Sequence, residues 1–227
     1  MTALEVVRAG RDSARAREDR APAARACRLQ HGARRVAERL SLETRIYGEA
    51  PKRPSILVAN HLSYLDPIAV AQAMPISAIA KAEVDRWPGI GRTLADLGIL
   101  FVRRGDPAHS AVALRKAMRL LDAGVSVLVF PEGTTTWGDE VLPFQRGVFG
   151  VAAIKAVPVA PIALRYDSRD LCWVGDTAFA PHFLRLHRYR RMVAHLHFAS
   201  AIEPGRFTRP EDAAEEARLR IRGLLRP

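Results

Sequence analysis

The chain has 227 residues, of which 48% are apolar, and its formal net charge at pH 7 is +11. The length suits one large domain, and the apolar content is sufficient for a buried core, so an intrinsically disordered polymer is excluded. The positive charge predicts a surface that attracts polyanions such as nucleic acid, anionic lipid headgroups or an acidic carrier protein. Composition alone does not choose among these partners.

Cysteine content and hydropathy narrow the class of protein further. Cys27 and Cys172 form no C-x-x-C pair, which argues against a disulfide scaffold and against a zinc site, so no metal is expected. No stretch of about 18 uninterrupted apolar residues is present, because Lys155 and two prolines interrupt the longest candidate, residues 148–164. We therefore predict no transmembrane helix, and early arginines exclude an apolar signal-peptide segment. A soluble or peripheral protein is expected.

Residues 1–43 are predicted to form a basic arm followed by an amphipathic helix, and residues 44–227 the main domain. From Pro22 to Leu40 the apolar residues recur at helical spacing. One face of this helix carries Ala26, Leu29, Ala33, Val36 and Leu40. A cationic amphipathic helix can lie in a lipid interface, where each arginine near an anionic surface adds about 1 kcal/mol. It can equally pack on the domain with a solvated basic face.

From residue 44 onward, short strand patterns alternate with helical ones. The predicted strands cover 44–47, 55–59, 77–80, 98–102, 125–130 and 157–164, and the predicted helices cover 67–74, 107–122 and 208–225. Continuous apolar runs such as 56–59 and 125–130 are typical of parallel strands buried on both faces. The pattern predicts an α/β fold with a largely parallel central sheet flanked by helices. The last helix should begin with a capping box at Thr208-Arg209-Pro210-Glu211.

The run Asn60-His61-Leu62-Ser63-Tyr64-Leu65-Asp66-Pro67 follows the predicted strand at 55–59. A histidine and a carboxylate five positions apart at a strand end suit a general base, because the carboxylate can fix the tautomer of the imidazole. In open α/β sheets, ligands bind at this carboxyl edge. Alternatively, Asp66 is a helix N-cap with Pro67 at N1, and His61 is a turn residue. Ser63 lacks a G-x-S-x-G elbow, so we expect a turn hydroxyl.

Two further strand ends carry polar residues. The strand at 125–130 runs into Pro131-Glu132-Gly133-Thr134, where Gly133 permits a positive φ or the close approach of a ligand. The strand at 98–102 ends in Arg103-Arg104, and paired arginines can clamp a phosphate through forked hydrogen bonds. Taken singly, residues 131–134 fit an ordinary loop, and Arg103 and Arg104 fit a solvent-exposed pair of arginines. Together with His61 they favour an active site.

These motifs resemble those of the PlsC-like glycerolipid acyltransferase family. The run from Asn60-His61 to Asp66 is similar to the family's N-H-x-x-x-x-D motif. The other matching segments are Gly98-x-Leu100-Phe101-Val102-x-Arg104, Phe130-Pro131-Glu132-Gly133-Thr134 and Val157-Pro158-Val159-Ala160-Pro161, with Lys81, Pro88 and Gly91 at fitting positions. The resemblance covers roughly residues 40–205, and four motifs in this order are highly specific.

The resemblance implies fatty acyl transfer from an acyl carrier protein or coenzyme A thioester to the hydroxyl of a lysolipid. It implies no covalent acyl-enzyme and no cofactor other than the thioester co-substrate. His61 would take the hydroxyl proton and Asp66 would orient the imidazole, a contribution of about 10²–10⁴ in rate. Arg104 would bind the anionic headgroup of the acceptor, while Glu132, Gly133 and Thr134 shape the pocket. No oxyanion donor can be named.

The expected acceptor is 1-acylglycerol-3-phosphate, which would give phosphatidic acid. However, Thr135 and Thr136 stand where lysophosphatidate enzymes often carry arginine and serine. This departure leaves lyso-ornithine lipid, or another large lysolipid, as an alternative acceptor. The resemblance also implies a peripheral enzyme at the cytoplasmic face of the membrane, with helix 22–40 as a candidate anchor.

The basic residues and the motifs allow other interpretations of the chain. The basic run at 185–191 fits a surface for lipid or acidic carrier protein, and it fits a solvated loop equally well. A basic module for nucleic acid would need aromatic residues interleaved with the basic patches, yet aromatic residues make up only 7% of the chain and do not cluster there. A non-catalytic lipid-binding relative is disfavoured because His61 and Asp66 are both present.

Overall fold

The computed structural model describes residues 21–85, 90–103 and 105–226. The strands are β1 (Leu42–Tyr47), β2 (Ile56–Ala59), β3 (Ile76–Lys81), β4 (Leu100–Val102), β5 (Ser126–Val129), β6 (Val159–Tyr166) and β7 (Met192–Phe198). The helices are α2 (Pro22–Leu40), α3 (Asp66–Ala73), α4 (Ala82–Asp85), α5 (Ile90–Asp96), α6 (Pro107–Asp122), α7 (Gly147–Lys155), α8 (Phe179–Leu186) and α9 (Pro210–Leu225), with a short 3-10 helix, η1, at Arg169–Leu171.

The seven strands form one sheet in the order β1-β7-β6-β2-β5-β3-β4. Every neighbouring pair from β6 to β4 is parallel, so the carboxyl ends of five strands meet at one edge. β7 runs antiparallel to β6, and β1 pairs parallel with β7. The predicted α/β fold with a largely parallel sheet flanked by helices is therefore confirmed.

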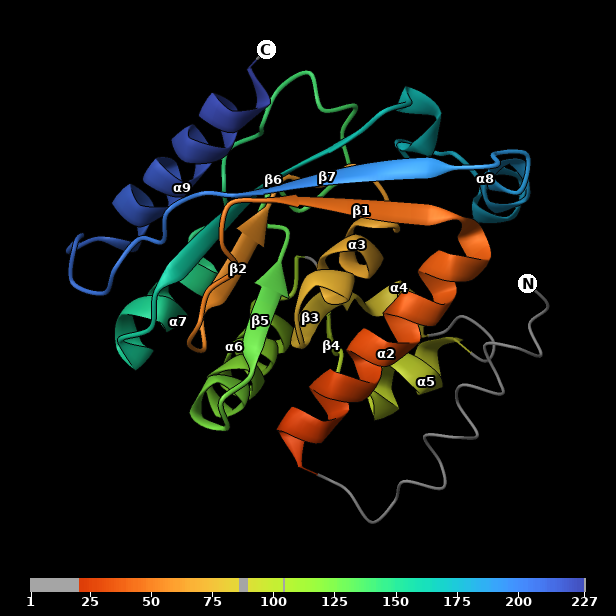
Figure 1. Cartoon of the computed structure of the whole chain (residues 1–227). Helices are drawn as coiled ribbons and strands as arrows, with labels where there is room; N and C mark the ends of the chain where they lie inside the picture. The colour runs from red at the N-terminus through yellow and green to blue at the C-terminus, as the bar shows by residue number, and fades with distance from the viewer. Residues whose placement is uncertain (1–20, 86–89, 104, 227) are drawn as a thin grey trace.

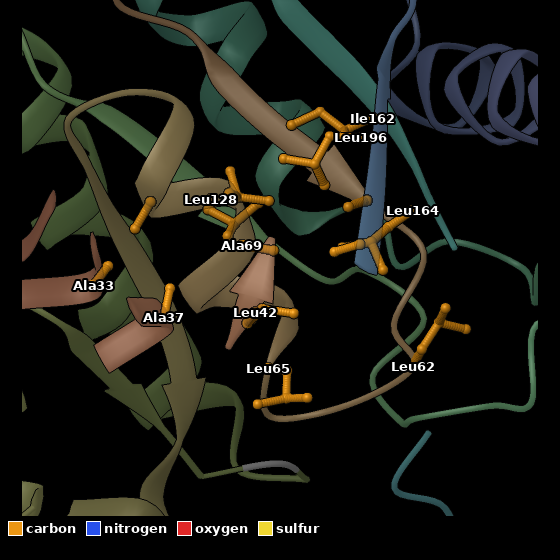
Figure 2. Close-up of a cluster of buried hydrophobic side chains, with 14 of the residues drawn as sticks. Ala33, Ala37, Leu42, Leu62, Leu65, Ala69, Leu128, Ile162, Leu164 and Leu196 are labelled. Atoms are coloured by element: carbon orange, nitrogen blue, oxygen red, sulfur yellow. The ribbon is translucent and has the colours of Figure 1, made fainter. Parts of the chain in front are cut away.

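Helices cover both faces of the sheet (Figure 1). On one face, α2 and α3 pack against side chains that include Leu57 and Ala59 of β2. On the other face, α6, α7 and α9 pack against Ile56 and Val58 of the same strand. Figure 2 shows the first of these clusters, where Ala33, Ala37, Leu42, Ala69, Leu128 and Leu196 are among the labelled side chains. Burial on both faces explains why β2 is apolar at every position.

The predicted helix at 22–40 has the bounds expected for it. Its buried residues are Ala26, Ala33, Ala37 and Leu40. The side chains of Gln30 and Arg34 donate hydrogen bonds of 3.1–3.2 Å to the carbonyl of Gln72 at the end of α3. The apolar side of α2 thus contributes to the core in this structure. Contact of this helix with a membrane, and the boundary at residue 43, stay predictions, and residues 1–20 lie outside the described ranges.

Helix α6 begins and ends as predicted, and the Asp106 side chain caps it by accepting a hydrogen bond from the His109 backbone N–H at 2.9 Å. The predicted capping box of the last helix is wrong. Its N-cap is Arg209, which makes no side-chain capping bond, so Thr208 has no capping role. The sequence did not predict β7, α4, α5, α7, α8 or η1. Within the described ranges, no helix is both long enough and apolar enough to cross a bilayer.

Candidate active site

The predicted catalytic residues lie at the carboxyl edge of the parallel strands. His61 follows β2, and its ring stacks on Phe130, which follows β5, with centroids 4.0 Å apart and planes 16° apart. The His61 side chain is 16% exposed, so it is supported on one side and still reachable from solvent. The neighbouring strands thus present the imidazole at the rim where a ligand of an α/β sheet would bind.

Asp66 connects the loop that carries His61 to strand β6 through its two carboxylate oxygens. Oδ2 lies 2.6 Å from Nδ1 of His61 and accepts hydrogen bonds from the backbone N–H groups of Leu62 and Ser63 at 2.7 and 2.9 Å. Oδ1 accepts from the hydroxyl of Tyr166 at 2.6 Å. The Asp66 side chain is completely buried, and these donors offset the cost of burying a charge.

This geometry assigns the tautomer of His61. A carboxylate only accepts hydrogen bonds, so Nδ1 of His61 carries the hydrogen that points to Asp66. The lone pair of the neutral ring is then on Nε2, which has no hydrogen-bond partner among the described residues. An imidazole held in this way can accept a proton at Nε2 while the carboxylate stabilises the resulting positive charge.

The interpretation of Asp66 as a helix N-cap is wrong. α3 begins at Asp66 itself, and the N-cap position is Leu65. The carboxylate turns back toward residues 61–63 instead of bonding the first-turn N–H groups of α3. The Asp66 oxygens are already engaged by His61 and by the backbone of the loop, so they do not cap helix α3.

Asn60 and Glu132 hold the backbone on either side of the histidine. Asn60 is buried and exchanges two hydrogen bonds of 2.8 Å with the backbone of Leu164 in β6. Glu132 Oε1 accepts from the backbone N–H of His61 at 2.8 Å, and Oε2 accepts from that of Leu142 at 2.9 Å. Burial raises the pKa of Glu132, against the lowering effect of these two backbone donors. The carboxylate of Glu132 thus ties two loops together at the site.

The residues after Glu132 complete this rim. Gly133 has φ 74°, a left-handed conformation that favours glycine, and a Cβ at this position would lie 2.6 Å from Nε2 of Gln145. Thr134 is exposed, and the backbone N–H of Thr136 donates to the His61 carbonyl at 2.8 Å. His61, Asp66, Glu132, Gly133 and Thr134 are thus all placed at one edge of the sheet.

Of the two arginines predicted to clamp a phosphate, the structure describes only Arg103. Arg104 lies outside the described residues, so the structure says nothing of its side chain. Arg103 is exposed and lies 3.8 Å from the carboxylate of Asp106. Of the other positions that matched the motifs, Lys81 pairs with Glu83, and Pro88 also falls outside the described ranges.

Tyr166 is a site residue that the sequence did not reveal. It is the last residue of β6, and its hydroxyl donates to Asp66 from a position 100 residues further along the chain. Burial and the neighbouring Asp66 carboxylate raise the pKa of Tyr166 well above its usual range, which keeps the hydroxyl protonated as a donor. No motif contains this tyrosine, and only the pairing of β6 with β2 brings it to the site.

A second hydrogen-bond network connects the loop that carries His61 to helix α8. The hydroxyl of Tyr64 donates to Nδ1 of His182 at 2.8 Å, and Nε2 of His182 donates to the carbonyls of Asp170 and Cys172, each at 3.1 Å. Burial lowers the pKa of His182, in agreement with a neutral ring that accepts at one nitrogen and donates at the other. The loop that carries His61 is therefore anchored on both the sheet and α8.

The chain is similar to known acyltransferases. Residues 31–165 match the family model described as Acyltransferase. The chain is similar to the lyso-ornithine lipid O-acyltransferase of Pseudomonas aeruginosa, with 32% identity over 201 residues that cover 85% of this chain and 78% of the relative. It is also similar to the 1-acyl-sn-glycerol-3-phosphate acyltransferase of Neisseria meningitidis, with 33% identity over 135 residues, or 59% of this chain and 53% of the relative.

The fold has a solved counterpart. The crystal structure of the 1-acyl-sn-glycerophosphate acyltransferase PlsC from Thermotoga maritima superimposes with a TM-score of 0.63 and 24% sequence identity. The match covers 88% of this chain and 78% of that one, which shows that the two share a fold. The family match spans more than half of the chain and includes the His61 and Asp66 loop. The chain therefore belongs to the PlsC-type acyltransferase family, and it is an acyltransferase.

Proposed function

We propose that this acyltransferase moves a fatty acyl group from a thioester to the free hydroxyl of a lysolipid, with His61 as the general base. The observation that carries the proposal is the pairing of His61 with a completely buried Asp66, which leaves Nε2 as the accessible proton acceptor. Lysolipids are the acceptors named for the relatives, and their hydroxyl is the group that such a base would activate.

In the proposed step, Nε2 of His61 takes the hydroxyl proton while the hydroxyl oxygen attacks the thioester carbonyl. Asp66 stabilises the imidazolium, and its own charge is balanced by the backbone donors and by Tyr166. The tetrahedral intermediate then expels the thiolate, which receives the proton from the imidazolium. Acyl carbon to ester oxygen is the bond formed and carbon to sulfur the bond broken, so no acyl-enzyme is needed.

Around this base we assign the remaining roles as follows. Glu132 holds the backbone of His61 in place, since both of its carboxylate oxygens accept backbone hydrogen bonds. Gly133 and Thr134 form the wall of the pocket beside it. Arg104 binds the anionic group of the acceptor, as the motif resemblance implies. The acyl donor is a thioester of acyl carrier protein or coenzyme A, and the enzyme works peripherally at the cytoplasmic face of the membrane.

For the acceptor we propose lyso-ornithine lipid first and 1-acylglycerol-3-phosphate second. Lyso-ornithine lipid O-acyltransferases of three bacteria match between 76% and 85% of this chain, whereas the matches to the Neisseria 1-acyl-sn-glycerol-3-phosphate enzymes cover 52–59%. The Thr135-Thr136 pair after Gly133 supports the same order. It removes one candidate phosphate ligand from the pocket.

The experiment is a thiol-release assay with acyl-CoA and acyl carrier protein donors and a panel of lysolipids. Release with lyso-ornithine lipid should exceed release with 1-acylglycerol-3-phosphate, and the reverse order would move the proposal to the second acceptor. His61→Ala should abolish release, while the exposed His31 on α2 offers a matched control, His31→Ala, that should not. Wild-type release by His61→Ala would refute the mechanism.

A further inference from the structure

Helix α8 and the segment after it carry an exposed surface that is both apolar and basic. Leu184 is 68% exposed, and Ala180, one helical turn earlier, is exposed on the same side. Residues 179–191 contain four arginines and no acidic residue. We define the α8 surface as Ala180, Leu184, Arg185, Arg188 and Arg190, all of which are exposed.

The inner side of α8 packs against the rest of the protein. His182 and Leu186 are each 1% exposed, and Phe183 packs partly buried against the core. Only the outer side, with Leu184, is left to solvent. A single exposed apolar side chain is ordinary in itself, as Ile154 on α7 shows with 73% exposure. What distinguishes Leu184 is the arginine-rich segment around it.

Helix α8 itself lies beside the loop that carries His61, which its inner side contacts, while the α8 surface faces outward. The ring of Tyr64 packs edge-on against Phe179 with centroids 5.0 Å apart, and its hydroxyl donates to His182. The backbone N–H of Trp173 donates to the carbonyl of Leu62 at 2.8 Å. Tyr64 and Leu62 both lie between His61 and Asp66 in the chain. In Figure 1, α8 is at one end of the sheet and α7 is at the other.

We propose that the α8 surface docks on the surface of an anionic bilayer. Leu184 enters the boundary between headgroups and acyl chains, and the arginines contact anionic headgroups. The inference rests on the proposed function, because a lysolipid acceptor and its product both reside in a membrane. Docking at α8 places the loop with His61 next to the source of the acceptor. The apolar side of α2, in contrast, is occupied by the core.

An acidic carrier protein is the competing partner for a basic surface. Arginines alone would suit such a protein, but a leucine that is 68% exposed amid them favours a lipid interface, where the apolar side chain gains by leaving water. The carrier protein therefore enters the test as an outcome that would overturn the proposal.

The test is co-sedimentation of the full chain with phosphatidylcholine vesicles, prepared with and without phosphatidylglycerol. Wild type should bind the anionic vesicles more strongly. Leu184→Glu should weaken this binding about tenfold, because an apolar side chain is removed from the interface. Arg188→Gln with Arg190→Gln should weaken it about fivefold per arginine.

Two matched controls lie elsewhere on the molecule. Ile154→Glu changes an equally exposed apolar residue on α7, and Arg115→Gln with Arg119→Gln removes two exposed arginines from α6. Both should bind vesicles within about twofold of wild type, since single surface residues outside a docking surface contribute little. Equal losses in the controls and in the α8 variants would show non-specific attraction by net charge and would overturn the proposal.

The second readout separates docking from catalysis. With short-chain, water-soluble acyl donor and lysolipid and no vesicles, Leu184→Glu should release thiol at the wild-type rate. Vesicle binding by Leu184→Glu equal to wild type would overturn the docking proposal and leave acyl transfer intact. Absence of thiol release from wild type, with vesicle binding that still depends on Leu184, would instead refute the proposed function. Vesicle binding unchanged in the arginine variant, with weaker binding of acyl carrier protein, would assign the surface to the carrier protein.

Discussion

The described residues include two histidine–aspartate pairs of nearly equal length, and only one of them has the arrangement that the proposed general base requires. In the first, Nδ1 of His61 lies 2.6 Å from Asp66, and in the second, Nε2 of His195 lies 2.7 Å from Asp167. The two carboxylates differ in exposure, at 0% for Asp66 and 57% for Asp167. Distance alone therefore does not identify a catalytic pair.

The two histidines also differ in the hydrogen-bond partners of their ring nitrogens. His195 has hydrogen-bond partners at both ring nitrogens, since its Nδ1 lies 3.2 Å from the hydroxyl of Tyr47. Its side chain is 6% exposed, and the ring of Tyr47 stacks beside it. Among the residues that the structure describes, His61 has a hydrogen-bond partner at one ring nitrogen only, and its side chain is more exposed than that of His195. A histidine works as a base when a buried carboxylate holds one nitrogen and the other faces the substrate.

The largest expected effect comes from removing each histidine in turn. His61→Ala should lower thiol release by about 10²–10⁴-fold, the usual contribution of general-base catalysis. His195→Ala should leave the rate within a few-fold of wild type, once the folded fraction is measured by circular dichroism. Comparable losses in the two variants would contradict the distinction between the pairs.

Substitution of the two carboxylates should also lower the rate unequally. Asp66→Asn should lower kcat by about 10²-fold, because an amide cannot stabilise the imidazolium with a negative charge. Asp167→Asn is the matched control, and its exposed carboxylate should contribute little to the rate. A steady-state assay at saturating acceptor would decide, and a mild effect of Asp66→Asn would argue that the neutral ring suffices.

A smaller effect is expected from the hydroxyls that contact the two pairs. Tyr166→Phe removes a hydrogen bond of 2.6 Å to Asp66 and should lower kcat by up to about tenfold, the equivalent of one charge-assisted hydrogen bond of about 1.5 kcal/mol. Tyr47→Phe, which removes the contact to His195, should not change kcat. If both variants keep full activity but lose stability, Tyr166 has a purely structural role.

The smallest effect concerns Glu132 and is read from stability. Burial raises the pKa of this group in the folded state, so the folded protein holds its proton more tightly than the unfolded chain. Its contribution to the free energy of unfolding is therefore present below about pH 4.5 and is lost as pH rises through the folded-state pKa. Glu132→Gln should remove this dependence, because an amide resembles the protonated acid in its acceptor oxygen and does not titrate.

The measurement for Glu132 is thermal unfolding of wild type and Glu132→Gln across the acidic range. The advantage of wild type should be largest at low pH and should shrink as pH rises. A constant difference would mean that Glu132 has the same pKa in the folded and unfolded states. The exposed Glu140→Gln serves as the control and should show neither effect.

Most of the fold was predictable from local pattern. β2 is apolar along its whole length, and β5 is apolar at every position after Ser126, because both faces of these strands are covered. The start and end of helix α6 are indicated by Asp106, Pro107 and Gly124. The sequence prediction omits β7, although His195 and His197 alternate with apolar residues as in a half-buried strand. The capping box failed because the Thr208 pattern competes with a proline that starts the helix on its own.

Roles at the site were less predictable than positions. His61 and Asp66 were found together because a short loop holds both. The Asp-Pro pattern also suggested a helix cap, and only the hydrogen bonds to residues 61–63 exclude it. The sequence predicts Glu132 in the acceptor pocket, whereas its bonds to the backbone of His61, 71 residues away, and of Leu142 could not be inferred from its neighbours in sequence.

Local sequence pattern is sufficient to predict the parallel sheet and the spacing of His61 and Asp66, because apolar runs and short loops are local properties. Three features depend on the folded structure: which histidine has a ring nitrogen with no partner among the described residues, which backbone groups the Glu132 carboxylate binds, and the contact of Tyr166 with Asp66. Each of these depends on contacts between segments that lie 71 to 148 residues apart in the chain. Such contacts form only when the strands are ordered in the sheet, so no local pattern contains them.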